Sequence, residues 1–160
     1  MTKLNLIDVL DEAAIYLDLG VEDKDALMER MAGLVSETHS AAPAEEILQK
    51  LKHREGVMST GIGNRVAVPH VTLEGLDQSR MFLFVLNDDV DFEAIDGQPV
   101  RVVFLLVVRP DDIAFHLQGL AHIARLARNP GLADDLCGAG SKGEVLEKLR
   151  EIESSAPAGA

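Results

Sequence analysis

The chain has 160 residues, with 27 acidic against 15 basic side chains and a formal net charge of −12. This balance argues against nucleic acid or an anionic membrane surface as a partner, because both are bound by clustered Lys and Arg. The hydrophobic fraction of 47% is that of a folded protein. Cys137 is the only cysteine, so neither an intrachain disulfide nor a thiolate-based zinc site can form.

The N-terminal stretch "MTKLNLIDVLDEAAIYLDLG" is acidic, unlike a signal peptide. The longest unbroken apolar run, residues 102–108, is far shorter than the ~20 residues that a membrane helix needs. We therefore expect a cytoplasmic protein without membrane insertion.

Two helices are predicted in the first third of the chain. Residues 22–37 have acidic side chains at their front and an apolar stripe at helical spacing, formed by Leu27, Met31, Leu34 and Val35. Pro43 is suited to the first turn of a second helix, whose stripe is Ile47, Leu48 and Leu51.

Three strands are predicted in the middle of the chain, at residues 65–68, 80–86 and 101–108. The last two are almost continuously apolar, which is typical of strands covered by helices on both faces of a sheet. Between them, Asp96-Gly97 is a hairpin signal that indicates some antiparallel pairing.

Two more helices are predicted towards the C-terminus, at residues 112–128 and 141–153. The second begins with a capping box, Ser141 followed three residues later by Glu144. The order of elements favours one mixed α/β domain over residues 1–153. Residues 154–160, "SSAPAGA", have little to bury, and we expect a disordered tail there.

The stretch "GIGNRVAVPH", residues 61–70, carries the first candidate site. Gly61 and Gly63 leave backbone N–H groups uncrowded, as an anion-binding nest requires, although the stretch has neither a Walker nor a Rossmann motif. Pro69 lacks an N–H and is expected to end the strand before it. His70 would then lie at the carboxyl end of a strand, where open α/β sheets bind ligands, or it would be a strand-end histidine without chemistry.

A second histidine, His116, heads the apolar face of the helix predicted at 112–128. It is either a core residue whose hydrogen bonds are satisfied within the protein or a group that faces a crevice at the helix start. The spacing does not decide between these two possibilities. His116 and His122 are six residues apart, about 240° around a helix, so they cannot share a metal as an i, i+4 pair does. No metal site is expected.

The motifs "REGVMSTGIGNRVAVPH", "DGQPVRVVFLLVVRP" and "HLQGLAHIARLARNP" resemble enzyme IIA of the fructose, mannitol and nitrogen-related branch of the bacterial phosphotransferase system. The resemblance covers about residues 4–153. It implies a three-layer α/β/α sandwich with a mixed central sheet, and a phosphotransferase component that works through a phosphohistidine without a cofactor.

The resemblance also implies roles for particular residues. His70 would accept a phosphoryl group from the histidine phosphocarrier protein, His116 would support it from the same crevice, and Arg54 would balance the phosphate charge. An alternative role for Arg54 is to complement a helix C-terminus. Thr60 and Asn64 are expected to form hydrogen bonds with the phosphate. Gly61 and Gly63 are expected to leave the loop backbone open beside it.

Two positions depart from the family pattern. Val71 stands where a small residue usually follows the active histidine, which raises a question about the local backbone and the choice of partner. Arg65 stands where many relatives have glycine, so an additional positive charge is expected near the site.

Three functions fit this resemblance. The favoured one is a nitrogen-related regulatory enzyme IIA, whose phosphorylation state changes which target proteins it binds. The second is a sugar-specific enzyme IIA of the fructose or mannitol type that passes phosphate to an enzyme IIB. The third is a binding module on the same fold that is not phosphorylated.

Overall fold

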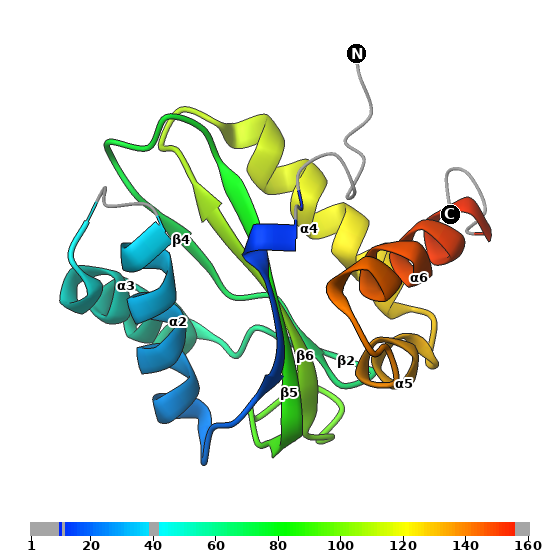
Figure 1. Cartoon of the computed structure of the whole chain (residues 1–160). Coiled ribbons are helices and arrows are strands. Elements are labelled where there is room, and N and C mark those ends of the chain that lie inside the picture. The colour runs from blue at the N-terminus through cyan, green and yellow to red at the C-terminus, as the bar shows by residue number, and fades with distance from the viewer. Residues whose placement is uncertain (1–9, 11, 39–41, 156–160) are drawn as a thin grey trace.

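The computed structural model describes residues 10, 12–38 and 42–155. A mixed sheet lies in the middle of the molecule, with helices on both faces (Figure 1). One helix layer is formed by α2 (Lys24–Thr38) and α3 (Ala44–Val57). The other layer is formed by α4 (Ile113–Ala127), α5 (Leu132–Cys137) and α6 (Lys142–Ser155). The predicted three-layer α/β/α fold with a mixed sheet is confirmed.

The sheet has six strands, and its path runs β1-β5-β6-β3-β2, with β4 also paired to β6. Their bounds are β1 (Ile15–Leu19), β2 (Gly61–Gly63), β3 (Val66–Ala67), β4 (His70–Thr72), β5 (Arg80–Val90) and β6 (Val100–Val108). A short 3₁₀ turn (Glu12–Ala14) precedes β1.

The central strands β5 and β6 explain the two apolar runs of the sequence. They pair antiparallel, and alternate side chains point into two separate hydrophobic cores. Leu83 and Phe104 belong to the core under α4, α5 and α6, whereas Phe84 and Val103 belong to the core under α2 and α3. Each strand is therefore apolar on both faces, as predicted.

The connection between β5 and β6 contains the predicted turn. The N–H of Gly97 donates to the carbonyl of Ala94 (2.9 Å), and Gly97 has a positive φ of 73°. Antiparallel pairing is therefore confirmed, although the connection is longer than a tight hairpin because the pairing stops at Val90 and Val100.

Several short elements were not predicted, and some predicted boundaries differ from the observed ones. No element was predicted at β1, β2, β4, the 3₁₀ turn or the six-residue helix α5. Strand β5 extends to Val90, past its predicted end at Leu86. The last helix, α6, extends to Ser155, two residues past the predicted end, and residues 156–160 of the predicted tail lie outside the described residues. Within the described part of the chain, no helix has the length and apolarity needed to cross a membrane.

The strand that carries His70 differs from the prediction in a way that positions the site. Pro69 does not end the pairing: β3 pairs in parallel with β6 before it, and β4 pairs in parallel with β6 after it, in the same register. Pro69 has no N–H to donate, but its carbonyl accepts a hydrogen bond from the N–H of Leu106 (3.0 Å). His70 therefore opens a second strand segment beside the interruption.

Candidate functional site

The ring of His70 is half-buried, and both of its nitrogens have partners. Nδ1 lies 3.3 Å from the carbonyl oxygen of Val68, and Nε2 lies 3.0 Å from Nε of Arg54. A carbonyl only accepts and a guanidinium only donates. Both contacts therefore assign the same tautomer, with the hydrogen on Nδ1 and the lone pair on Nε2.

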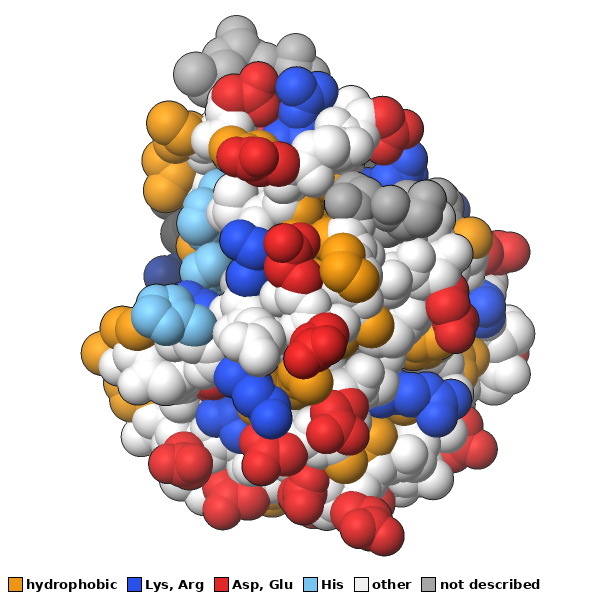
Figure 2. Space-filling view, turned by 90° about the vertical axis from the view of Figure 1, so that its left-hand side faces the viewer, with side chains coloured by type: hydrophobic (Ala, Val, Ile, Leu, Met, Phe, Trp, Pro, Cys, Tyr) orange, Lys and Arg blue, Asp and Glu red, His pale blue; other side chains and the backbone are white. Residues whose placement is uncertain are grey.

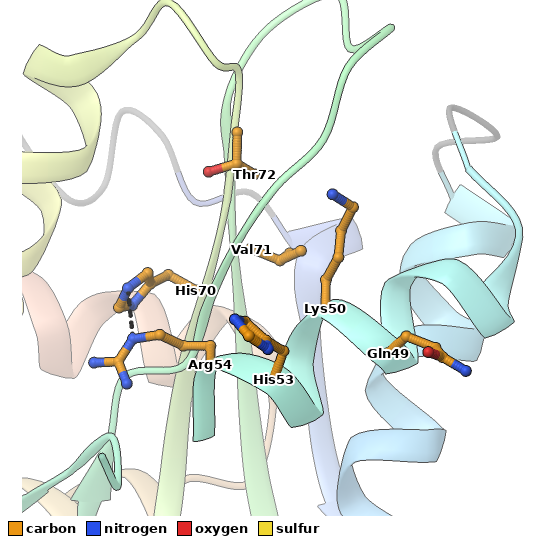
Figure 3. A pocket seen from close by; sticks show the side chains of 7 residues that line it. All are labelled: Gln49, Lys50, His53, Arg54, His70, Val71 and Thr72. Atoms are coloured by element: carbon orange, nitrogen blue, oxygen red, sulfur yellow. Dashed lines mark hydrogen bonds between the residues drawn. The ribbon is translucent and has the colours of Figure 1, made fainter. Parts of the chain in front are cut away.

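Arg54 lies in the last turn of α3 and makes two contacts. Its Nε–H donates to His70, and its Nη1 donates to the carbonyl of Met58 (2.7 Å), the residue that follows the helix. Figure 3 shows the first of these bonds between the helix and the strand. Two roles were considered for Arg54 from the sequence, one at the phosphate-accepting histidine and one at the helix C-terminus. The structure shows a contact of Arg54 at each of these places.

His116 lies next to His70, in the first turn of α4. The ring centroids are 4.7 Å apart, with the ring planes inclined by 52°. Nε2 of His116 is buried and has no hydrogen-bond partner among the residues that the structure describes. The prediction that His116 lies beside His70 is confirmed, and its buried Nε2 is a polar group whose hydrogen-bonding capacity the described residues leave unused.

A groove extends from His70 along the exposed side of α3. It is lined by Gln49, Lys50, His53, Arg54, His70, Val71 and Thr72 (Figure 3). None of these lining residues is acidic, although the chain as a whole is strongly acidic. Lys50 and His53 were not predicted to lie at the site. Lys50 precedes His53 by three residues and Arg54 by four, and this spacing would have indicated that it lies beside both on a helix.

Burial is the main cause that lowers the pKa of His70 below its ordinary value of 6.5, and the positive charge of Arg54 and the neighbouring His116 lower it further. The carbonyl of Val68 and the carboxylate of Glu55 oppose this shift without reversing it. The imidazole of His70 is therefore neutral at pH 7, with its Nε2 lone pair available as a nucleophile.

This shift predicts how His70 titrates. Its ring resonances are expected to titrate with a midpoint below pH 6.5 in an NMR titration. The unfolded chain binds more protons than the folded protein between the two pKa values, so the stability due to His70 is complete above about pH 6.5 and falls as the pH drops below it. Urea unfolding at several pH values should show that His70→Gln loses this part of the acid dependence. A midpoint at or above 6.5 would contradict the expectation.

The glycine-rich loop has an internal structural role. A Cβ on Gly61 would lie 2.7 Å from the Cβ of Ala94, so glycine is required by close packing against the β5–β6 connection. Gly63 has a φ of 103°, in the left-handed region that favours glycine. These two positions are explained by the fold itself.

The predicted donors of this loop also have partners within the protein. The N–H groups of Thr60 and Gly61 donate to Glu55 and to the hydroxyl of Ser59, respectively. The side-chain amide of Asn64 donates to the carbonyl of Ala127 (2.7 Å). The phosphate-binding role of Thr60, Gly61, Gly63 and Asn64 therefore stays a prediction.

The two departures from the family pattern are accommodated locally. Val71 is buried in β4 opposite Val107, and its φ is not positive, so a β-branched residue fits the strand. Arg65 has a φ of 69°, and its guanidinium is paired with Asp89 (3.1 Å) and Asp134 (2.9 Å). The additional positive charge is thus held by two carboxylates instead of lying in the groove.

Fold and site together define a class: α/β domains in which a strand of the central mixed sheet carries a histidine at the site. The family model described as "Phosphoenolpyruvate-dependent sugar phosphotransferase system, EIIA 2" matches residues 8–152. A nitrogen regulatory protein of Pseudomonas aeruginosa is 34% identical over 151 residues, which cover 94% of this chain and 98% of that protein. The chain therefore belongs to this enzyme IIA family.

Solved structures agree with this assignment. The nitrogen regulatory protein IIA-Ntr of Neisseria meningitidis superposes with a TM-score of 0.81 at 30% identity, covering 89% of this chain and 97% of that chain. In a complex of mannitol enzyme IIA and phosphorylated enzyme IIB from Escherichia coli, the matching chain has a TM-score of 0.73 at 20% identity, covering 89% and 97% of the two chains. The second likeness shows the fold alone. Membership of the family implies phosphoryl transfer through a histidine.

Proposed function

We propose that the protein is a phosphocarrier whose His70 accepts a phosphoryl group on Nε2 from the histidine phosphocarrier protein. The observation that carries the proposal is the geometry of the ring: Nδ1–H points to the carbonyl of Val68, and the Nε2 lone pair faces the guanidinium of Arg54. A neutral imidazole is thus held with one nucleophilic nitrogen beside a positive charge.

The transfer step balances without an additional reactant. The P–N bond of the donor's phosphohistidine breaks as the P–N bond to Nε2 of His70 forms, and the donor ring recovers its lone pair. The hydrogen on Nδ1 of His70 stays in place and remains bonded to Val68. Arg54 moves its Nε–H from the ring nitrogen to an oxygen of the arriving phosphoryl group, whose negative charge persists throughout the transfer.

His116 would support the phosphoryl group from the other side of the crevice. Its buried Nε2 has no partner among the described residues, although the ring is in contact with His70. A phosphoryl oxygen beside His70 would give this nitrogen a hydrogen-bond partner.

The surroundings of the site favour a protein as the phosphoryl donor. Large aliphatic side chains are exposed at the ends of the two helices that carry Arg54 and His116, namely Val57 (72%), Met58 (71%), Ile113 (68%) and Leu117 (62%). Figure 2 shows histidine side chains at the edge of one face of the molecule, with hydrophobic side chains near them. Exposed apolar groups around a reactive residue are typical of a protein-binding surface.

Among the members of the family, we propose the nitrogen-related regulatory type. This is supported by relatives with this name that are at least 30% identical over nearly their full length. The partners would then be the phosphocarrier protein and regulated target proteins. The sugar-specific alternative requires delivery of the phosphate to an enzyme IIB, the kind of protein with which the mannitol enzyme IIA of Escherichia coli forms its complex.

Incubation with phosphoenolpyruvate, enzyme I and the histidine phosphocarrier protein tests the proposal. One acid-labile phosphate is expected per chain, and NMR spectroscopy of the labelled protein should place it on Nε2 of His70. Uptake of no phosphate would contradict the carrier function. Rapid transfer from the labelled protein to an enzyme IIB, measured with isotopic phosphate, would favour the sugar-specific type over the regulatory one.

A further inference from the structure

A buried carboxylate directly follows Arg54 in the sequence. The side chain of Glu55 is only 4% exposed and is paired with Nζ of Lys24 (2.8 Å), from α2. Its two oxygens accept the N–H of Thr60 at 3.1 and 3.2 Å, and it also accepts the Thr60 hydroxyl. Burying a carboxylate is unfavourable unless its hydrogen bonds are satisfied, and here they are.

From Thr60 the hydrogen bonds continue to the ring of His70. The carbonyl of Thr60 accepts the N–H of Val68 (2.9 Å), and the carbonyl of Val68 lies 3.3 Å from Nδ1 of His70. The chain of contacts therefore reaches the ring nitrogen that Arg54 does not touch. Two consecutive residues in the last turn of α3 are thus connected to the two ring nitrogens of His70. Arg54 contacts Nε2 directly, and Glu55 is linked to Nδ1 through the backbone of Thr60 and Val68.

The far end of this network is anchored to a second part of the fold. Lys24 also donates to the carbonyl of Phe92 (3.3 Å), and its ammonium lies 4.7 Å from the centroid of the Phe92 ring. The hydroxyl of Ser59 donates to the same carbonyl. The segment before β2 is thereby fixed by α2 and by the β5–β6 connection at once.

We propose that Glu55 is a positioning residue for phosphoryl transfer, which holds His70 in the Nδ1–H tautomer by fixing Thr60 and, through it, Val68. The inference rests on the proposed role of His70 as phosphoryl acceptor. Glu55 does not touch the ring, and its contribution is to keep the Val68 carbonyl where it accepts Nδ1–H. The lone pair then remains on Nε2, facing Arg54 and the groove.

The alternative is that the Lys24–Glu55 pair only stabilises the fold. The two roles differ in what they predict for a folded variant. A purely structural pair would change the unfolding midpoint and leave the ring of His70 as it is. A positioning role changes the balance between the two tautomers of His70 in the folded protein.

The test uses Glu55→Gln, which keeps the shape and one acceptor oxygen, and Glu46→Gln as the matched control. Glu46 lies in the first turn of the same helix and is exposed, so this change removes the same charge without touching the network. The double variant Lys24→Met/Glu55→Gln removes both charges of the pair. Thr60→Val removes only the hydroxyl bond to Glu55.

Nitrogen-15 NMR of the His70 ring and the rate of labelling by the phosphocarrier protein are measured in each variant that unfolds cooperatively. Glu55→Gln, or the double variant if the single one does not fold, should populate the Nε2–H tautomer and lower the labelling rate at least ~10-fold. Thr60→Val should shift both readouts in the same direction, and Glu46→Gln should match the wild type.

Wild-type tautomer populations in folded Glu55→Gln and in the double variant would overturn the positioning role. If the wild-type protein takes up no phosphate, the proposed function fails, and the NMR comparison still decides whether Glu55 sets the tautomer.

Discussion

His70→Ala is expected to abolish labelling by the histidine phosphocarrier protein, because it removes the nitrogen whose lone pair faces Arg54. The neighbouring His116 does not replace it in our proposal. Its ring lies in the first turn of α4, its Nε2 is buried, and no arginine contact to it is found among the described residues. The variant should remain folded, since the His70 ring is only half-buried and belongs to neither hydrophobic core.

His116→Ala is the informative comparison, because the two rings are neighbours and this variant removes the other imidazole. We expect slower labelling in His116→Ala, with the phosphate still on His70. Rapid-quench experiments that start from isotopically labelled phosphoenolpyruvate measure the labelling rate of both variants. Circular dichroism verifies that both are folded. Full labelling of His70→Ala would assign the acceptor role to His116 instead. The same conclusion would follow if folded His116→Ala lost all labelling while His70→Ala kept it.

Much of the fold could be predicted from local patterns. The apolar runs of β5 and β6 and the stripes of α2, α3 and α4 are strong periodic signals, and the structure has helices or strands at each of them. The short elements were missed for a physical reason. β4 has only three residues and is held by its pairing with β6, a contact between segments far apart in the sequence.

The site shows the same limit more clearly. The motif identified His70, His116 and Arg54, and the fold brings these three together. The motif did not reveal why the glycines are there. Gly61 is needed for contact with Ala94, a residue from a connection that no local pattern places beside it. Glu55 was missed because its burial depends on Lys24 in another helix.

Pro69 illustrates how a local rule can be correct in its chemistry and wrong in its consequence. Proline does remove a hydrogen-bond donor from the strand, as predicted. The partner strand compensates, because Leu106 donates to the Pro69 carbonyl and the pairing resumes at His70. The interruption leaves the Val68 carbonyl with Nδ1 of His70 beside it. The proline therefore contributes to the site through the backbone on either side of it.

Arg54→Gln is expected to slow phosphoryl transfer at least ~10-fold, equivalent to ~1.4 kcal/mol of transition-state stabilisation. The structure gives Arg54 two contacts, so two effects are expected from one substitution. Loss of the bond to the Met58 carbonyl should cost ~0.3–1 kcal/mol of stability, as for other cations at a helix C-terminus. Loss of the guanidinium beside Nε2 removes the positive charge that would face the arriving phosphoryl group.

The kinetic effect separates these roles, and salt dependence adds a second criterion. Single-turnover labelling of Arg54→Gln is compared with that of Lys52→Gln, which removes an exposed positive charge from the same helix. Both changes alter the net charge equally, so a loss of long-range attraction would slow both variants and would fade at high salt. A contact at the reacting atoms should slow only Arg54→Gln, and much of its effect should persist at high salt because the group is partly buried. If folded Arg54→Gln showed wild-type labelling kinetics at low salt, the role of Arg54 would be limited to its contact with the C-terminal end of α3.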